Sequence, residues 1–245
     1  MLPVTVRGVF PSRFTADGSR LFMARQKRQS LIHTLFEDEA RGSGFGRVAG
    51  LDEVGRGALA GPVVAAAVIL DPETPVPEGL DDSKKLTPLQ RERIAEELRR
   101  TAVCYAYGLI SPEEIDATNI LIATRRAMLQ ALEKLQPCAD FLLIDALQLR
   151  ESPLPQKAII RGDSASASIA AASVLAKTYR DALMRDYDTQ FPHYGFARHV
   201  GYGTRDHWAA LKAHGCCPIH RRSFRGVVPE ENSEGEGAGE EAPAG

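Results

Sequence analysis

The sequence predicts a single α/β domain in which helices flank a mixed β-sheet. Short apolar segments of strand length are interspersed with longer segments that carry helix start signals. Their order is strand, strand, helix, strand, helices, strand, strand, helix. With 245 residues, of which 44% are hydrophobic and 25% are charged, the chain can form a core large enough to hold a buried site.

Two segments are expected to flank this domain, which we place at residues 29–228. Residues 1–28 have no clear period in their first 22 positions. They are either a disordered extension or, in part, sequence upstream of a true start at Met23. Residues 229–245 are rich in Glu, Gly and Ala and contain six acids and no base, which predicts a disordered acidic tail.

The first half of the domain is expected to contain two helices and three strands. A short helix is predicted at residues 29–40. Thr87, Pro88 and Gln90 combine a capping box with a proline at the first helical position, which predicts a helix to about residue 100. Three apolar segments are predicted strands: 47–52, 62–70 and 103–109. The second is continuously apolar, so we expect it to be covered on both faces.

The second half is expected to contain a helical region, two strands and a long helix. Ser111 and Glu114 repeat the capping signal and open a helical region to about residue 135. Leu121, Met128, Leu132 and Leu135 are expected to share one face of it. Residues 141–145 and 157–161 are predicted strands. Residues 166 to about 187 form the long helix, whose alanine and serine content predicts close packing on a sheet.

Several classes of protein are excluded or disfavoured. The longest apolar run, residues 63–70, is too short to span a membrane, and the N-terminus is a poor signal peptide, so a cytoplasmic location is expected. A monomer is the default expectation. The six histidines lack zinc-ligand spacing, and no P-loop or nucleophile elbow is present. The cysteines form no C-x-x-C pair, which favours reduced thiols: Cys104, Cys138, Cys216 and Cys217.

The charge distribution indicates a polyanionic partner. The net charge is −2, but without the six acids of the tail the remainder has 30 basic and 26 acidic residues, or +4. Residues 198–225 contain six of these bases against the single acid Asp206. Such a cluster can match a nucleic acid, although alone it is better explained as a solvated face.

Four acids stand at the ends of predicted elements: Asp52, Glu53, Asp145 and Asp163. One such acid by itself is usually a cap or a turn former. Gathered together, carboxylates repel one another, so a site built from four of them generally contains a cation. Hard oxygen ligands select Mg²⁺ or Mn²⁺, and two such ions roughly 4 Å apart can promote phosphodiester hydrolysis. Whether the acids converge depends on the fold.

Three other features have both a functional and a plain interpretation. Gly55-Arg56-Gly57 follows the first two acids and can hold a phosphate or the sugar edge of a nucleotide, or be an ordinary glycine turn. Lys84 lies in a polar loop and can meet a phosphate or remain solvated. Tyr202, between two glycines, can stack on a sugar or base, or serve the structure only.

Together these segments resemble the ribonuclease HII family over about residues 46–227. Seven stretches match in the order of the family: G-L-D-E-V-G-R-G-A-L-A-G-P-V (50–63), D-D-S-K-K-L (81–86), L-L-I-D-A-L (142–147), R-G-D-S (161–164), A-A-S-V-L-A-K-T-Y-R-D (171–181), H-V-G-Y-G-T (199–204) and P-I-H-R-R-S-F (218–224). The first and fifth are highly specific.

The resemblance implies a ribonuclease H-like fold, with a mixed five-stranded sheet, flanking helices and a helical C-terminal part. It implies that Asp52, Glu53, Asp145 and Asp163 bind two Mg²⁺ or Mn²⁺ ions. Gly55, Arg56 and Gly57 match the loop that senses the 2′-hydroxyl, Tyr202 matches the tyrosine that stacks on the deoxyribose at the junction, and Lys84 matches a lysine near the substrate phosphate.

The implied activity is cleavage of RNA in RNA–DNA hybrids and on the 5′ side of single ribonucleotides in duplex DNA, leaving 5′-phosphate and 3′-hydroxyl ends. It serves ribonucleotide excision repair and removal of RNA primers. Two departures from the family are Ala146, where some members have glycine, and Cys216-Cys217, which replace small or polar residues and predict a changed loop before His220.

Three alternatives remain. Ribonuclease HIII has similar acids, but its substrate-binding domain needs more than the roughly 45 residues that precede the first strand. A non-catalytic binder of hybrids is expected to have lost an acid, and all four are present. A purely structural α/β domain leaves the joined motifs unexplained.

Overall fold

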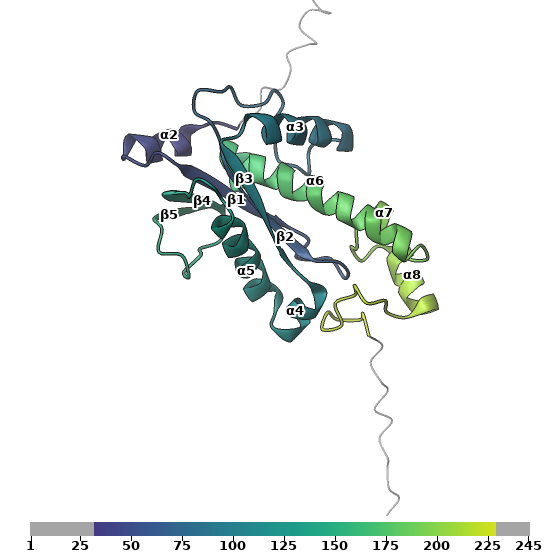
Figure 1. Ribbon diagram of the computed structural model, residues 1–245. Helices are drawn as coiled ribbons and strands as arrows, with labels where there is room; N and C mark the ends of the chain where they lie inside the picture. Colours follow the sequence, from purple (N-terminus) through teal and green to yellow (C-terminus); the bar gives the residue numbers. More distant parts are fainter. Residues whose placement is uncertain (1–31, 229–245) are drawn as a thin grey trace, which may run out of the picture. The chain divides into compact units, whose positions relative to one another are not determined.

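Residues 32–228, the part of the chain that the computed structural model describes, contain the strands and helices in the predicted order (Figure 1). The expectations for residues 1–28 and 229–245 concern segments outside this range. The elements are α2 (Leu35–Gly42), β1 (Val48–Val54), β2 (Val63–Ile69), α3 (Pro88–Thr101), β3 (Cys104–Ile110), α4 (Pro112–Ala117), α5 (Ile120–Glu133), β4 (Phe141–Asp145), β5 (Gln156–Ile159), the 3₁₀ helix η1 (Gly162–Ser164), α6 (Ala167–Gln190), α7 (Phe196–His199) and α8 (Arg205–His214).

The five strands form one mixed sheet in the order β3-β2-β1-β4-β5, which confirms the predicted architecture. The central strand β1 pairs antiparallel with β2 and parallel with β4. The outer pairs are antiparallel for β2 and β3 and parallel for β4 and β5. Because Leu51 pairs with Ile144, Asp52 and Asp145, which follow these two residues, lie side by side near the carboxyl ends of β1 and β4.

Helices cover both faces of the sheet, α5 on one face and α6 on the other, with α3 packed on α6 (Figure 1). All seven residues of β2 are buried, as its continuous apolar sequence predicts. Alternate side chains of β2 point to opposite cores: Ala65 and Ala67 pack with α5, whereas Ala66 and Val68 pack with α6.

Two glycines allow the covering helices to approach the sheet closely. A methyl group at Gly50 in β1 would overlap the backbone carbonyl of Ser168 in α6. A methyl group at Gly108 in β3 would overlap the carbonyl oxygen of Ala127 in α5. Both helices are therefore seated on the sheet by backbone contact, which fixes α6 and the segment before it relative to β1.

The predicted starts of the helices that follow Thr87 and Ser111 are confirmed. The helix predicted at residues 29–40 begins later, at Leu35, and three further details of the prediction are wrong. Thr87 and Ser111 each form a full capping box, at α3 and α4. The helical region after Ser111 is divided, because Asn119 leaves helical geometry and caps α5. Leu121, in the first turn of α5, is 42% exposed and does not share the buried face with Met128.

The other correction concerns the end of β5, predicted at residue 161 and observed at Ile159. Ile160 is 84% exposed, and Arg161 adopts a left-handed conformation with φ of 57°. A residue in that conformation turns the chain out of the sheet, so the strand ends and η1 begins.

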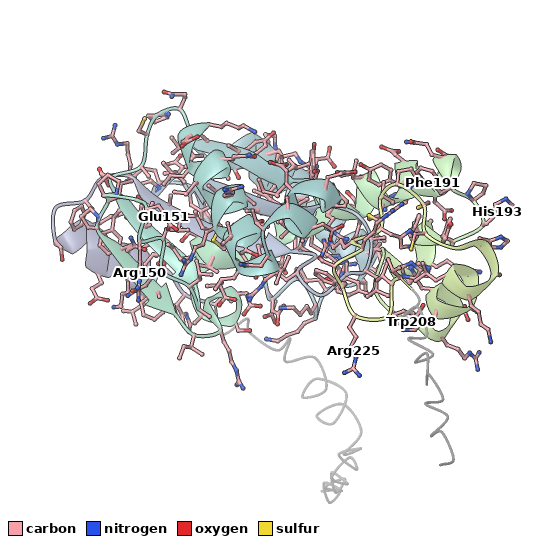
Figure 2. All side chains as sticks on the ribbon, turned by 90° about the horizontal axis from the view of Figure 1, so that it is seen from below. Arg150, Glu151, Phe191, His193, Trp208 and Arg225 are labelled. Atoms are coloured by element: carbon pink, nitrogen blue, oxygen red, sulfur yellow. The ribbon has the colours of Figure 1, made fainter. Side chains whose placement is uncertain are left out.

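The C-terminal part packs on the end of α6 and on the loop between β1 and β2. Its small core contains Met184, Phe196, Leu211 and Ile219, together with Leu59 and Ala60 from that loop. Figure 2 shows Phe191, His193, Trp208 and Arg225 at this end of the domain and Arg150 and Glu151 at the other. Among the described residues, no helix is long and apolar enough to cross a membrane.

Candidate active site

The four predicted acids lie together at the carboxyl edge of the sheet. Asp52 and Glu53 are near the end of β1, and Asp145 ends β4, which is paired with it. The Asp145 carboxylate accepts a hydrogen bond from the amide of Gly162 at 2.7 Å, which holds η1 and its Asp163 beside the strand ends. Three separate elements therefore deliver the carboxylates to one place.

Burial and mutual repulsion act on these carboxylates. Burial, followed by the charge of Glu53, raises the pKa of Asp52 well above its usual value. Hydrogen bonds donated by Ser173 and by the Glu53 amide oppose this shift without cancelling it. Burial also raises the pKa of Glu53 against the opposing charge of Arg56. The pKa of Asp145 is raised by burial, and the charge of Asp163 adds to the shift. The cluster thus holds more negative charge than its surroundings balance, and a bound cation relieves this.

Lys84 provides a cation from the protein itself. Its Nζ donates to Asp163 Oδ2 at 3.0 Å and lies 3.9 Å from Asp82 Oδ1. Desolvation opposes the charged form, but the hydrogen bond and charge of Asp163 raise the pKa of Lys84. Within residues 32–228 no three His, Cys, Asp or Glu side chains are already arranged as a set of metal ligands. The donor chemistry of four carboxylates nevertheless fits hard divalent ions.

Two loops border the acids. The first, residues 55–61, is called here the arginine loop. Its Arg56 donates to Glu53 Oε1 at 3.2 Å and is otherwise largely exposed. The second, residues 200–204, is called the tyrosine loop. A methyl group at Gly57 would lie 3.9 Å from Tyr202 Cε1, so the two loops meet at the Tyr202 ring.

Strained backbone accompanies three of the predicted site residues. Ala146, Arg161 and Val200 have φ values of 48°, 57° and 45°, although none is glycine. Ala146 follows Asp145, and the other two lie two residues before Asp163 and Tyr202. Such conformations cost of order 1–3 kcal/mol each and persist only where the surrounding structure imposes them.

The structure contains buried charged residues near the site that charge patterns alone did not identify. Glu37 in α2 is 1% exposed and accepts from the Ser166 hydroxyl at 2.6 Å and the Ser168 amide at 2.8 Å, at the start of α6. Arg180 and Arg221 are both fully buried. Arg221 is therefore not part of an exposed basic face. Both arginines lie within stretches that carry the family resemblance, which was the available signal.

A cluster of neutral histidines supports the tyrosine loop from inside. His220 Nδ1 accepts from the Cys217 amide at 2.9 Å, so its proton lies on Nε2, 3.0 Å from His207 Nε2. His207 Nδ1 in turn donates to the Tyr202 carbonyl at 3.0 Å. Desolvation and the neighbouring His207 lower the pKa of His220 to about 4.

This cluster predicts a loss of stability in acid. The folded pKa of His220 is about 4 and its ordinary value is 6.5, so between these values the unfolded chain takes up a proton that the folded chain refuses. We expect His220 to lower the free energy of unfolding by up to about 3 kcal/mol as pH falls from 6.5 to 4. Denaturant unfolding at pH 7 and 4.5 measures this loss.

The comparison is between the parent chain and His220→Gln, because carboxylates with raised pKa values contribute with the opposite sign. His220→Gln should show a smaller loss between the two pH values, whereas the exposed His193→Gln should behave as the parent does. An identical pH dependence in the parent and His220→Gln would show that this histidine is not the group responsible.

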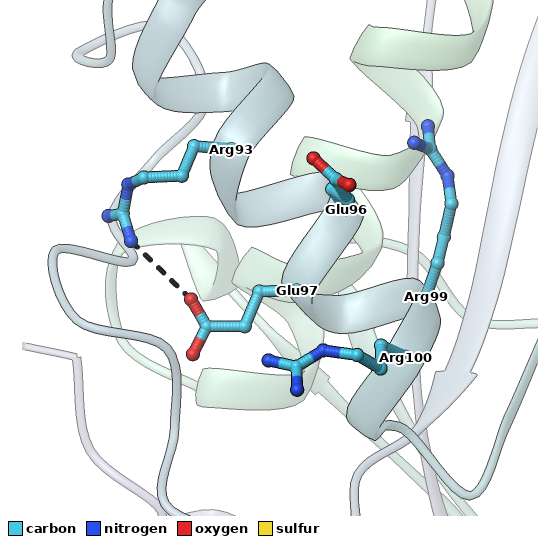
Figure 3. Close-up of a pocket in the computed structure, with 5 residues that line it drawn as sticks. All are labelled: Arg93, Glu96, Glu97, Arg99 and Arg100. Atoms are coloured by element: carbon cyan, nitrogen blue, oxygen red, sulfur yellow. Dashed lines mark hydrogen bonds and ion pairs between the residues drawn. The ribbon is translucent and has the colours of Figure 1, made fainter.

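A surface hollow of about 470 Å³ runs along α3 and is separate from the predicted site. Figure 3 shows its lining: Arg93, Glu96, Glu97, Arg99 and Arg100. Arg93 pairs with Glu97 at 3.4 Å, one helical turn away. These residues belong to a single helix and include none of the predicted site residues, so we interpret the hollow as part of a solvated helix face.

The chain is similar in sequence and in fold to proteins of one family. Residues 49–227 match the family model described as Ribonuclease HII. The ribonuclease HII of Syntrophotalea carbinolica is 53% identical over 192 residues, which cover 78% of this chain and 91% of that protein. The crystal structure of ribonuclease H2 from Pyrococcus horikoshii OT3 superposes with a TM-score of 0.63 at 25% identity, covering 74% of this chain and 94% of that chain.

A more distant structure, Bst-RNase HIII in complex with Mn²⁺, shares the fold with a TM-score of 0.52 at 20% identity. The alignment covers 69% of this chain and 63% of that chain. Sequence identity is thus much higher to the HII relative than to the HIII structure.

Proposed function

Because this chain belongs to the ribonuclease HII family, we propose that it cuts on the 5′ side of ribonucleotides in duplex DNA, using Asp52, Glu53, Asp145 and Asp163. The family membership makes it a ribonuclease H endonuclease that degrades RNA in RNA–DNA hybrids. The choice of single ribonucleotides, the two-ion mechanism and the chemistry of the ends are our proposal.

One observation carries the proposal: three elements bring four acids to one edge of the sheet. The pairing of Leu51 with Ile144 sets Asp52 beside Asp145, and the Gly162 amide holds η1 against Asp145. A structural role for these acids does not require such a grouping, since raised pKa values mean that it costs stability at neutral pH. A catalytic cation site does require it.

The residues divide the reaction between them. The four carboxylates would hold two Mg²⁺ or Mn²⁺ ions, which would supply positive charge beside the attacking water and the leaving oxygen. Water attacks the phosphorus, and the bond to the 3′-oxygen of the preceding nucleotide breaks. The products are a 3′-hydroxyl and a 5′-phosphate on the ribonucleotide. Lys84, released from Asp163, contacts a substrate phosphate.

Recognition of the ribose falls to the two loops. The segment Gly55-Arg56-Gly57 contacts the 2′-hydroxyl through its backbone and the Arg56 guanidinium, and the Tyr202 ring stacks on the deoxyribose at the junction. Their contact at Gly57 supports this division, because both sugars must be read at adjacent positions. All these residues come from one chain, which favours a monomer. We place the activity in the cytoplasm, in ribonucleotide excision repair and primer removal.

The deciding experiment is cleavage of an end-labelled DNA duplex that contains one ribonucleotide, with Mg²⁺, with Mn²⁺ and with chelator. We expect a metal-dependent cut 5′ of the ribonucleotide. Cutting of a continuous RNA–DNA hybrid alone would indicate another type of ribonuclease H. No cutting of either duplex would contradict the proposal.

Arg56→Ala is expected to weaken recognition of the ribose more than binding of the phosphate backbone. We expect KM for the single-ribonucleotide duplex to rise about tenfold, the effect of one lost charged hydrogen bond. The inhibition constant of an all-DNA duplex should change much less. Arg47→Ala is the matched control, because its side chain is 50% exposed against 49% for Arg56 and it lies at the other end of β1. Equal weakening on both duplexes would contradict this role.

A further inference from the structure

Arg180 and Arg221 are buried cations that bind the backbone of the two recognition loops. Both have an exposed fraction of zero. From α6, Arg180 donates through Nε to the Pro62 carbonyl at 3.0 Å, through Nη2 to Ala60 at 3.0 Å and through Nη1 to Val200 at 2.8 Å. One guanidinium thus joins the end of the arginine loop to the start of the tyrosine loop.

Arg221 holds the arginine loop from the C-terminal part of the domain. Its Nε and Nη2 donate to the Gly61 carbonyl at 2.9 and 2.8 Å, and its Nη1 donates to the carbonyl of Arg56 at 2.9 Å. This clamps the two ends of the arginine loop to one side chain. The carbonyl of Arg56, the residue expected to read the ribose, is held directly.

Both guanidinium groups donate their hydrogen bonds to backbone carbonyl oxygens. Neither forms an ion pair with a carboxylate of residues 32–228. Burial and the neighbouring Arg180 charge lower the pKa of Arg221 to about 9. Burying two cations close together is costly unless every donor is used. Arginine suits this role because its planar fork reaches several fixed acceptors at once, whereas lysine has a single nitrogen.

The loops are shaped around these side chains. A methyl group at Gly55, where φ is +92°, would overlap the Arg180 guanidinium, and one at Gly201 would overlap the Ala60 carbonyl. The Leu59 amide donates to Gly201 at 2.8 Å, and the Arg221 amide donates to Leu59 at 2.9 Å. The guanidinium of Arg180 lies 5.7 Å from the centre of the Tyr202 ring. Gly55 therefore makes room for Arg180 as well as for a ligand.

We propose that Arg180 and Arg221 are positioning residues that lock the arginine loop to the tyrosine loop and so set the spacing at which ribose and deoxyribose are told apart. This inference rests on the proposed function. The two buried side chains cannot touch the substrate, but they control the selectivity for ribose over deoxyribose through the position of the loops. General binding of duplexes depends on exposed phosphate contacts and is left unaffected.

The test uses Arg221→Lys and Arg180→Lys, which keep the charge and lose the fork. KM and kcat are measured on the single-ribonucleotide duplex with the metal-loaded enzyme, and an all-DNA duplex serves as a competitive inhibitor. We expect KM for the ribonucleotide duplex to rise about tenfold to a hundredfold, the scale of a misplacement of about 1 Å. The inhibition constant of all-DNA duplex should stay within about twofold. Arg185→Lys, on the same helix but exposed, is the matched control.

The outcomes of this test separate failure of the inference from failure of the proposed function. If folded Lys variants keep the parent KM, or lose affinity for both duplexes equally, the inference is wrong. If the parent chain itself does not cut the ribonucleotide duplex, the proposed function has failed instead, and hydrogen exchange still tests the lock.

Hydrogen exchange on the parent chain also covers the case in which neither variant folds. In the lock, the Leu59 amide donates to the Gly201 carbonyl and the Arg221 amide donates to the Leu59 carbonyl, while the Gly201 amide donates to His199 Nδ1. These three amides should therefore become exposed in a single opening step with a common free energy. Independent opening of residues 200–204, with residues 55–61 still protected, would overturn the inference.

Discussion

Asp52→Asn is expected to reduce kcat for hybrid cleavage roughly 10³-fold or more and to leave duplex binding within a few-fold of the parent. Asparagine keeps the shape of the side chain but removes a charge from the cluster that we propose holds the ions. Asp145→Asn should have the same effect, since its carboxylate lies beside Asp52. Single-turnover cleavage and binding of labelled hybrid measure the two quantities separately.

Asp140→Asn is the matched control. Asp140 directly precedes β4 at the end opposite Asp145, where it accepts from the amides of Gly46 and Arg47 at 3.1 and 2.8 Å. Asparagine can accept at least one of these bonds, so activity should be retained. Loss of hybrid binding in Asp52→Asn, or its full activity, would contradict the catalytic assignment.

Gly50→Ala is expected to lower the free energy of unfolding by about 4 kcal/mol, above the roughly 1–3 kcal/mol that is typical of overpacked cores. The added methyl group would overlap the backbone of Ser168, which cannot move aside as a flexible side chain can. To accommodate it, α6 must shift away from β1. Denaturant unfolding at neutral pH measures the loss, and the residual folded enzyme should also cleave more slowly because Asp163 precedes α6.

Gly42→Ala provides the comparison, because a methyl group at this α2 position meets nothing within 4 Å. Alanine favours helix over glycine, so a gain of up to about 1 kcal/mol is expected there. If both substitutions leave the unfolding midpoint unchanged, the helix does not rest on the strand as closely as the structure has it.

Local signals predicted most of the elements. The apolar run became β2, and the capping boxes at Thr87 and Ser111 open α3 and α4, because caps and apolar runs act over only a few residues. The early end of β5 was missed because Arg161 turns the chain through a left-handed backbone conformation. An arginine in the sequence does not indicate that conformation. Likewise, spacing alone placed Leu121 on a buried face that the sheet does not cover at the first turn of α5.

The acids of the site could be named from the sequence, but their proximity could not. It depends on the parallel pairing of Leu51 with Ile144, between strands whose sequences do not specify a partner. The burial of Arg221 was equally hidden. Its hydrogen-bond acceptors are backbone carbonyls, which every residue has. The sequence therefore does not distinguish basic residues that face solvent from basic residues that are buried.

Strand β1 has one neighbour close to it in the chain and one far away. β2 follows after a short loop, whereas residues 55–140 separate β1 from β4. The meander of β1, β2 and β3 can therefore pair while synthesis continues, but contacts between distant segments must wait. Asp52 meets Asp145 and Asp163 only after those residues have left the ribosome. A nascent chain therefore lacks the complete set of four acids until most of the domain has been made. If these acids are the catalytic set proposed above, a partly synthesised chain cannot hydrolyse nucleic acid.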